Sequence, residues 1–410
     1  MRRIAVLLAL VVAVWPASSA LAGGSTTTRG TAAGRMQADF NDDGFADLAV
    51  AAPFEDIGTV SDAGAVHVLY GTPTGLTATG TQLLTQDSPG VPGTAEVGDD
   101  FGFALAAGDF DNDGFADLAV GVPGEDLGGG FAAEGGVNVL YGAAGGLTGG
   151  QLFTQDSPGV PGVAEVGDVF GATLAAGDFD NDGADDLAVG ASGEDLGGVE
   201  HGGAVNVLFG AGGGLTGIGG QLFTQDSPGV GDSAEDFDAF GETLAAGGFD
   251  NDGFDDLAVG VSREDVGSVF DGGAVNVLPG TAGGLTGTSS QLFTQDSPGV
   301  PGVAESDVFG ERLAAADFDN DGFADLAVGA PGEDIGTIVE GGAVNVVYGT
   351  AGGLTGTGSQ LFTQDSPGMP GMAEDTDLFA EALAASGPQS ATAPPASPSP
   401  SGLRRASPQQ

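Results

Sequence analysis

An acidic motif of the form DFDNDGFADLAVG occurs five times at a nearly constant interval, and this repetition limits the architectures open to the chain. The copies begin at Asp39, Asp109, Asp178, Gly248 and Asp317. The interval is always 69 or 70 residues. Self-similarity at a fixed period indicates a solenoid, a propeller or another repeat array, so the 410 residues need not form ordinary separate domains.

Each repeat contains about four short apolar segments separated by Gly- and Pro-rich turns. In the second repeat they cover residues 118–121, 136–142, 151–154 and 170–176. The second of these has the alternation of a strand, and none has the length or periodicity of a helix. Four antiparallel strands per radially repeated unit are typical of a propeller blade. We therefore predict an all-β fold, a β-propeller of five four-stranded antiparallel blades.

The two ends of the array look like the two parts of one blade. The segment before the first acidic loop, residues 35–38, lacks the FG…LAA strand that precedes the other loops. Residues 378–385 match that strand but precede no loop. We therefore predict split-blade ring closure, with 378–385 beside residues 47–51 so that no sheet edge stays free. An open, arc-like stack and a longer ring formed with another chain are the alternatives.

The repeated acidic motif has the pattern of a calcium loop. Acidic side chains at positions 1, 3 and 5 point inward, Gly at position 6 allows a sharp turn, position 7 offers its carbonyl and position 9 a carboxylate. Oxygen ligands alone favour calcium over zinc or copper. Position 12 is Val120 rather than Glu, so these loops are not EF-hands. The predicted ligands, in chain order, are Asp39, Asn41, Asp43, Phe45 and Asp47; Asp109, Asp111, Asp113, Phe115 and Asp117; Asp178, Asp180, Asp182, Ala184 and Asp186; Asp250, Asp252, Phe254 and Asp256; and Asp317, Asp319, Asp321, Phe323 and Asp325.

The five loops are unequal, although together they predict up to five Ca²⁺ ions. Three have the complete acidic set. The first has the neutral Asn41 at position 3, which weakens binding somewhat. The fourth has Gly248 at position 1, so the site at Asp250–Asp256 is expected to be the weakest or empty. Magnesium is a weaker alternative, because it prefers a smaller and more hydrated octahedral site.

The pattern FG-x-x-LAA-x-DF-DNDG-x-x-DLAVG resembles the FG-GAP repeat, found in the propeller of integrin α subunits and in many exported bacterial proteins. The pair Phe309-Gly310 and Gly329-Ala330-Pro331 supplies both halves of that name. The resemblance covers residues 36–387. It implies propeller blades with calcium bound in the acidic loops. Leg, membrane and cytoplasmic segments of an integrin have no counterpart, so integrin signalling is not implied.

The charge balance excludes some partners. The chain has 58 acidic residues against 8 Arg and no Lys, a formal net charge of −50. Such a surface repels nucleic acid and anionic membranes. The chain has no cysteine, so no disulfide stabilises the fold and metal ions are the candidates for that role.

Both termini differ in composition from the array. Residues 1–22 resemble a signal peptide, with Arg2 and Arg3, an apolar stretch and an Ala-Leu-Ala site that predicts cleavage after Ala22. Residues 23–35 are expected to be a flexible linker, and the Pro/Ser-rich residues 388–410 a disordered tail. We therefore expect an exported, extracellular protein without a membrane-inserted segment.

No catalytic set is evident. His67 occupies a strand position that is Asn in the other repeats, and His201 lies in a variable turn. There is no G-x-S-x-G motif and no cysteine nucleophile. Some five-bladed propellers are glycosidases that use paired acids, so a hydrolase stays an alternative. Its candidate acids break the repeat: Glu200, Asp232, Asp236, Asp238, Asp271 and Glu340.

These observations favour a secreted, calcium-binding module that binds or adheres to an extracellular protein or glycan and is not an enzyme. The recognition loops would be the segments that vary between repeats. A structural or surface-coating protein without a specific ligand is the other alternative, and the sequence leaves the oligomeric state open. The variable segments are residues 57–64, 127–135, 196–203, 266–272 and 335–341, together with 91–100, 160–169, 230–239, 300–308 and 369–378.

Overall fold

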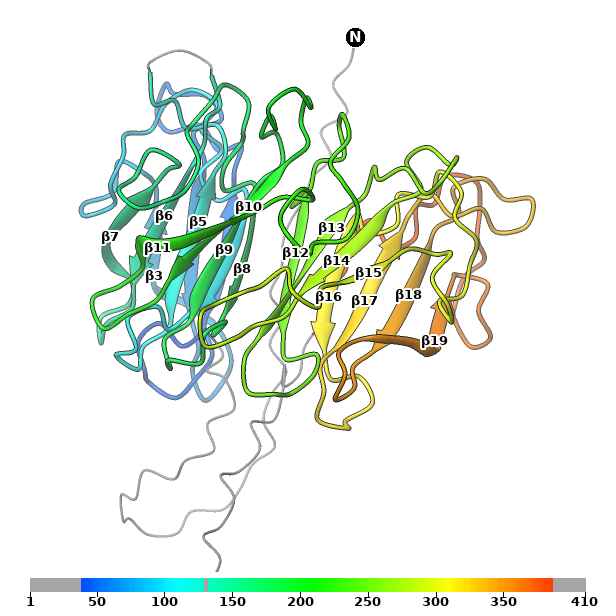
Figure 1. The fold of residues 1–410 in the computed structure, drawn as a ribbon. Helices are drawn as coiled ribbons and strands as arrows, with labels where there is room; N and C mark the ends of the chain where they lie inside the picture. Colours follow the sequence, from blue (N-terminus) through cyan, green and yellow to red (C-terminus); the bar gives the residue numbers. More distant parts are fainter. Residues whose placement is uncertain (1–37, 129–131, 386–410) are drawn as a thin grey trace, which may run out of the picture.

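The protein is an array of five antiparallel β-sheets in a computed structural model that describes residues 38–128 and 132–385 (Figure 1). The predicted signal peptide, linker and tail lie outside these residues. The strands are β1 Leu48–Ala52, β2 Ala65–Tyr70, β3 Thr77–Leu84, β4 Leu105–Gly108, β5 Asp117–Val122, β6 Gly136–Tyr141, β7 Thr148–Phe153, β8 Thr173–Gly177, β9 Asp186–Ala191, β10 Ala204–Phe209, β11 Thr216–Phe223, β12 Thr243–Gly247, β13 Asp256–Val261, β14 Ala274–Leu278, β15 Gln291–Phe293, β16 Arg312–Ala316, β17 Asp325–Ala330, β18 Ala343–Tyr348 and β19 Thr355–Phe362.

Each sheet is one repeat, and its strands lie side by side in chain order. Blade 1 contains β1–β3, and blades 2 to 5 contain β4–β7, β8–β11, β12–β15 and β16–β19. Blade 1 has three strands and the others have four. All pairings within the blades are antiparallel. The predicted all-β fold of five propeller blades is confirmed.

The blades pack face to face, which explains why their central strands are apolar on both sides. Every residue of β5 is buried, and the same is true of β9, β13 and β17. Four apolar clusters fill the spaces between consecutive blades. In each, a Phe from the acidic loop of one blade contacts Leu and Val side chains of the next, as Phe110 does with Leu187 and Val189. Stability therefore comes largely from contacts between neighbouring repeats.

The FG dipeptide before each inner strand anchors that strand to the preceding blade. Phe170 is fully buried, and its N–H donates to the Glu134 carbonyl of blade 2 at 3.1 Å. Gly171 has φ +92°, and a Cβ there would lie 2.4 Å from the Gly136 carbonyl oxygen. Only glycine avoids both the strain and the clash. This close approach explains the Gly of the FG pair.

The predicted split-blade ring closure is not found among the described residues, where 378–385 does not pair with β1. Phe379 does anchor to blade 5, since its N–H donates to the Gly341 carbonyl at 3.2 Å. Arg312 Nε also donates to the Glu381 carbonyl at 2.8 Å. Residues 381–385 form no strand, however, and within the described residues β1 pairs only with β2. The repeated blade–blade packing sets the curvature, and five repeats do not bring β1 back to residues 378–385.

A buried Asn at the centre of the second strand ties each blade to the turn before it. Asn138, Asn206 and Asn345 donate from Nδ2 to the carbonyls of Pro92, Pro161 and Pro301 at 2.6–2.7 Å. Two repeats lack this bond. In the fourth, Gly231 replaces the Pro, and both amide atoms of Asn276 have no partner. In blade 1 the position is His67, which is exposed because no other blade of the described residues covers this side.

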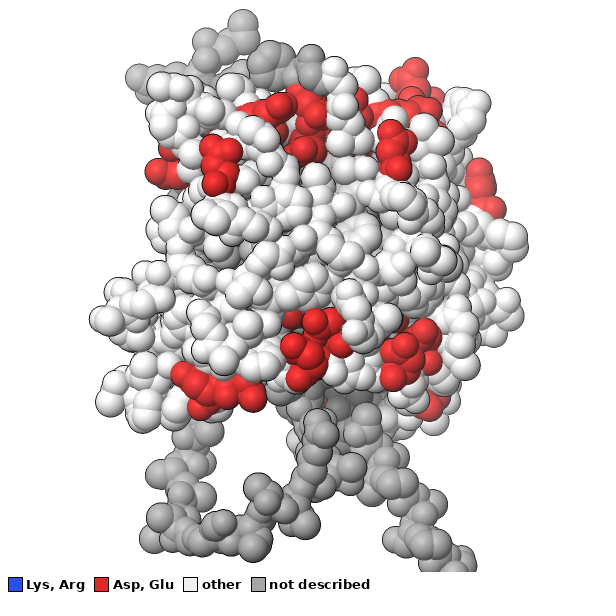
Figure 2. Space-filling view, turned by 90° about the vertical axis from the view of Figure 1, so that its left-hand side faces the viewer, with Lys and Arg blue, Asp and Glu red and all other residues white. Residues whose placement is uncertain are grey.

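The two ends of the blades carry different loops. The acidic loops run into β1, β5, β9, β13 and β17, whereas the variable segments follow the opposite ends of those strands. Topology therefore separates an acidic-loop rim from a variable-loop rim. In Figure 2, acidic side chains form two bands near opposite edges, with an uncharged belt between them.

Candidate metal centres

The carboxylate at position 9 is the structural centre of each acidic loop. Asp117 is fully buried at the start of β5. Its Oδ2 accepts a hydrogen bond from Phe110 N at 2.8 Å, and its Oδ1 accepts one from Gly142 N at 2.8 Å. The same two bonds recur in all five loops. Buried backbone N–H groups need acceptors. This Asp therefore holds the start of the acidic loop and the end of the next strand (β6 in blade 2) together even where a metal site is incomplete.

Three loops bring carboxylates from positions 1, 3 and 9 together. In each, one ligand atom per residue lies within 4.8 Å of the other two. The groups are Asp109, Asp111 and Asp117; Asp178, Asp180 and Asp186; and Asp317, Asp319 and Asp325. These are the three loops that the sequence predicts to be complete. A cluster of oxygen ligands on one short loop suits calcium.

The position 1 carboxylate also shapes the loop backbone. Asp109 Oδ1 accepts from Asp113 N at 3.0 Å, and Asp109 Oδ2 accepts from Gly114 N at 3.1 Å. Loops 1, 3 and 5 repeat both bonds. Loop 4 has neither, because Gly248 carries no side chain. That loop retains only Asp250 and Asp256 at the positions of a triad, and its weaker calcium binding stays a prediction.

The carboxylate at position 5 lies outside the triads in the described structure. Asp113 Oδ1 accepts a hydrogen bond from Phe115 N at 2.9 Å, and all five loops share this contact. In loop 1, Asn41 Oδ1 accepts from Asp43 N at 3.0 Å, as Asp111 does from Asp113. The residue at position 4 has φ between 51° and 61°, which Asn and Asp tolerate well. This explains the N of the DNDG motif.

Burial raises the pKa of the position 9 carboxyl groups. Desolvation raises the pKa of both Asp117 and Asp186 to about 8 and that of Asp256 to about 7, although backbone N–H donors oppose the shift. Neighbouring carboxylates raise it further. The only Arg side chains among the described residues are Arg263 and Arg312, and neither contributes to the pKa of these three carboxyl groups. A divalent cation would favour the ionised form and offset the cost of burial.

The missing carboxylate in loop 4 offers a gain-of-function test. We expect Gly248→Asp to complete a fourth triad with Asp250 and Asp256 and to raise the calcium stoichiometry by one. Isothermal titration calorimetry on the variant and the wild type measures this difference. Gly248→Asn, which adds a side chain of similar size without charge, is the control. Equal stoichiometry in Gly248→Asp and wild type would contradict the assignment of position 1 as a ligand.

A second acidic cluster recurs at the blade junctions near the variable-loop rim, and sequence reasoning did not detect it. Gln225 Nε2 donates to Glu264 Oε2 at 2.5 Å, from one blade to the next. The equivalent pairs are Gln86–Glu125, Gln155–Glu194 and Gln295–Glu333. A buried Asp lies beside each Glu: Asp99, Asp168, Asp238 and Asp307. The constant spacing of 38 or 39 residues between Gln and Glu was the available signal.

These junction acids predict a pH dependence of stability. Desolvation and the nearby Asp238 and Asp232 raise the pKa of Glu264 from 4.5 to about 8. The pKa of Asp168 rises from 3.8 to about 7 for the same first reason. At a pH between the ordinary pKa and the raised pKa of such a group, the folded state binds more protons than the unfolded state. The free energy of unfolding therefore falls as pH rises. We expect the melting temperature in excess calcium to decrease between about pH 5 and pH 8.

The variant Glu264→Gln tests the source of that slope. The neutral amide imitates the protonated acid, so the variant should lose part of the pH dependence and be less destabilised at the alkaline end. Glu200→Gln, an exposed change on the same rim, is the control. A wild-type melting temperature that rises over this range, or an unchanged slope in Glu264→Gln, would contradict the assignment.

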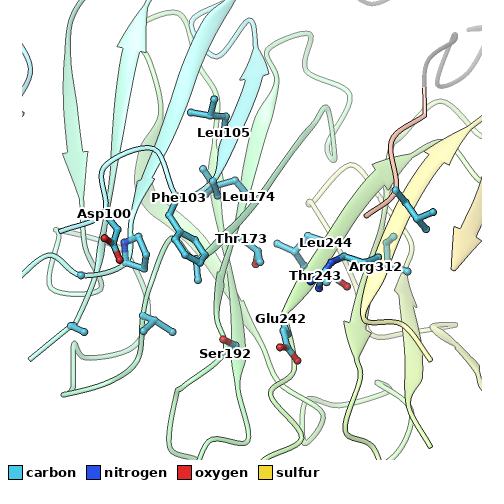
Figure 3. A pocket seen from close by; sticks show the side chains of 18 of the residues that line it. Asp100, Phe103, Leu105, Thr173, Leu174, Ser192, Glu242, Thr243, Leu244 and Arg312 are labelled. Carbon is cyan, nitrogen blue, oxygen red and sulfur yellow. The ribbon is translucent and has the colours of Figure 1, made fainter. Parts of the chain in front are cut away.

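A cavity of about 630 Å³ lies between the first strands of blades 2 to 5, β4, β8, β12 and β16. Figure 3 shows Phe103, Leu174 and Leu244 around it, with Glu242 and Arg312 on its wall. The hydroxyls of Thr173 and Thr243 donate to the carbonyls of Gly241 and Gly310, so they serve as contacts between blades. The cavity is largely apolar, and its polar lining includes Asp100, Ser192 and Glu242.

Of the acids considered for a hydrolase, Asp232 and Asp238 both lie beside Glu264 at the junction of blades 3 and 4, and the others lie in loops. Asp236 accepts from Glu200 N at 3.0 Å, and Asp238 occupies the junction position of Asp99, Asp168 and Asp307. Asp271 and Glu340 lie at equivalent turns of different blades, where both have positive φ. His201 shares that turn position and stacks on Phe237, with ring centroids 5.4 Å apart.

The five antiparallel blades, each entered through an acidic loop, define a repeat protein of the propeller class. A sequence profile of the FG-GAP repeat matches residues 36–69, 101–138, 170–208 and 309–347. The chain is an FG-GAP repeat protein related to the N-terminal propeller region of integrin α subunits. The repeat that contains Gly248 lies outside the matched segments.

Three relatives illustrate the similarity. Integrin alpha-3 of Cricetulus griseus is 32% identical over 173 residues, 42% of this chain and 15% of its own length. Integrin alpha-5 of Xenopus laevis is 28% identical over 256 residues, 59% and 21% of the two chains. Phosphatidylinositol-glycan-specific phospholipase D of Rattus norvegicus is 34% identical over 113 residues, 28% and 13%. The aligned part is thus about a fifth or less of each relative. The described residues contain no helix that could cross a membrane.

Proposed function

We propose that the protein is a secreted, calcium-stabilised propeller whose variable-loop rim binds an extracellular protein or glycan. The observation that carries this proposal is the pairing of the two sets of variable segments. Phe237 N donates to the Glu200 carbonyl at 2.8 Å, and Leu378 N donates to the Glu340 carbonyl at 3.1 Å. Segments that are far apart within one repeat therefore form a joint surface, opposite the acidic loops.

Exposed apolar side chains on that rim favour a binding role over a purely solvating one. Val97, Phe237, Phe270 and Val339 are all exposed there, between acidic residues. Solvent-facing aromatic and aliphatic groups within a polar surround are typical of interaction sites. Calcium in the acidic loops would hold the blades that carry these loops, so partner binding would depend on calcium indirectly.

A binding screen tests the proposal. The exported chain, residues 23–410, is applied to a glycan array and to a panel of extracellular matrix proteins, with calcium and with a chelator. We expect retention of a partner in calcium only, and at least a tenfold loss of affinity in the double variant Phe237→Ala, Phe270→Ala. Ile218→Ala, an exposed change on strand β11, is the matched control.

The alternatives predict different outcomes. A surface-coating protein without a specific ligand would retain nothing in the screen. A hydrolase would release sugar from the array glycans, and loss of that activity in Asp238→Asn would identify it. Export itself predicts that the protein recovered outside the cell begins at Gly23.

A further inference from the structure

The free ends of the arc expose side chains that every internal junction buries. Phe40, Phe110, Phe179 and Phe249 are at most 1% exposed because the next blade covers them. Phe318 is their equivalent in blade 5 and is 45% exposed. Met369 is 38% exposed, whereas Val160, Val230 and Val300 at the same position are 7–8% exposed. We call the surface formed by Phe318, Gln360, Phe362, Met369 and Pro370 the trailing face.

Blade 1 exposes the opposite half of the same junction. Leu147, Leu215, Leu285 and Leu354 are 2–3% exposed against the preceding blade, but their equivalent Leu76 is 48% exposed. Leu48, Val50 and Leu69 are half-buried, whereas their counterparts in blade 2 are fully buried. We call the surface formed by Leu48, Val50, His67, Leu69 and Leu76 the leading face.

The polar groups of the two faces also match those of an internal junction. Between blades 4 and 5, Gln291 Nε2 donates to the Leu354 carbonyl at 2.9 Å and Leu354 N donates to Gln291 Oε1 at 3.0 Å. Gln360 on the trailing face and Leu76 on the leading face are the equivalent pair. The Asn–Pro contact of the internal junctions has equivalents at the two ends. His67 takes the place of the Asn and offers an imidazole N–H as donor, and Pro370 offers its carbonyl as acceptor.

Backbone groups at the two ends match as well. Ala324 N donates to the Gly248 carbonyl and Thr350 N to the Phe249 carbonyl across the last internal junction, at 3.1 and 3.2 Å. The equivalent acceptors on blade 5 are the Asp317 and Phe318 carbonyls, and the equivalent donors on blade 1 are Ala46 N and Thr72 N. Within the described residues these groups make no such contact.

We propose that the leading face of a second copy of this chain docks on the trailing face of the first, in a head-to-tail contact that reuses the blade–blade junction. A second copy fits because this surface already pairs four times within one chain, with the same residue types. The contact joins different surfaces of the two molecules, so it extends into an open chain or closes into a ring according to the rotation between copies. The net charge of −50 opposes it, so association should strengthen with salt.

Two variants and their mixture test the proposal in calcium-loaded residues 23–410 by analytical ultracentrifugation. Wild-type mass should rise with concentration. Leu76→Asp removes the leading face and Met369→Asp the trailing face, and each should weaken association more than tenfold because a carboxylate would be buried without a partner. A mixture of the two variants retains one intact face of each kind. It should therefore form a one-to-one heterodimer and nothing larger.

The control Ile218→Asp places the same charge on an exposed position away from both ends and should associate like wild type. Melting curves establish that each variant is folded. A wild type that stays monomeric at all concentrations overturns the proposal, as does a mixture that stays monomeric. Undiminished self-association of either single variant also overturns it.

Discussion

Removal of calcium from the calcium-loaded protein should lower its melting temperature on the order of 10 °C. Ligand binding to the native state stabilises it by mass action, and each site adds about 2.7 kcal/mol when free calcium is a hundredfold above its dissociation constant. The three Asp triads would together contribute about 8 kcal/mol on that basis. Differential scanning calorimetry with calcium, and after addition of EDTA, measures the difference.

Magnesium is the control for this experiment. It should restore little of the lost stability, because the triads combine a flexible loop with many oxygen atoms and Mg²⁺ requires a tighter octahedron. An unchanged melting curve in EDTA, starting from calcium-loaded protein, would rule out a stabilising role for metal ions in these loops.

Replacement of Asp186 by Ala should lower the free energy of unfolding through both its hydrogen bonds and its metal site. It leaves Gly210 N without the acceptor that lies 2.8 Å away. Phe179 N loses the Asp186 carboxylate at 2.9 Å but keeps the Gly177 carbonyl at 3.1 Å. A buried, unsatisfied N–H costs about 1–3 kcal/mol, so we expect a loss of about that size from Gly210 N before any loss of calcium. Urea denaturation of the variant and the wild type gives the change in the free energy of unfolding.

Asp256→Ala is the matched control, because it removes the same two backbone contacts in the loop that lacks a position 1 acid. Asp256 accepts from Phe249 N and Gly280 N, both at 2.9 Å. In EDTA the two variants should lose similar stability. In calcium, Asp186→Ala should lose more, and the difference is the contribution of the metal. Equal losses under both conditions would mean that Asp186 acts only through its hydrogen bonds.

The repeat made most of the fold predictable from sequence. Its period identified the blades, and the alternation in residues 136–142 located β6, which the structure places at Gly136–Tyr141. Glycine at loop position 6 predicted the sharp turn, because a positive φ is a local preference of glycine. The inequality of the loops was also predictable. Gly248 has no carboxylate, and packing of neighbouring side chains cannot supply one.

The failures concern contacts between repeats. Residues 378–385 resemble an inner strand, and a strand motif alone does not say which edge it will meet. Arg312 and Gly341 hold that segment on blade 5, away from β1. The Gln225–Glu264 pair was missed for a similar reason, because its members belong to different blades and each looks like part of an ordinary turn.

The repeated blade, its acidic loop and the inequality of the five loops could be predicted because they depend on residues close together in the chain. The open form of the array, among the described residues, depends instead on how the blades pack against one another. Curvature is the sum of many small packing contacts between blades, and no single motif encodes it. For the same reason the exposure of Phe318 and Leu76 at the two ends could not be read from residues whose equivalents are buried in every other repeat.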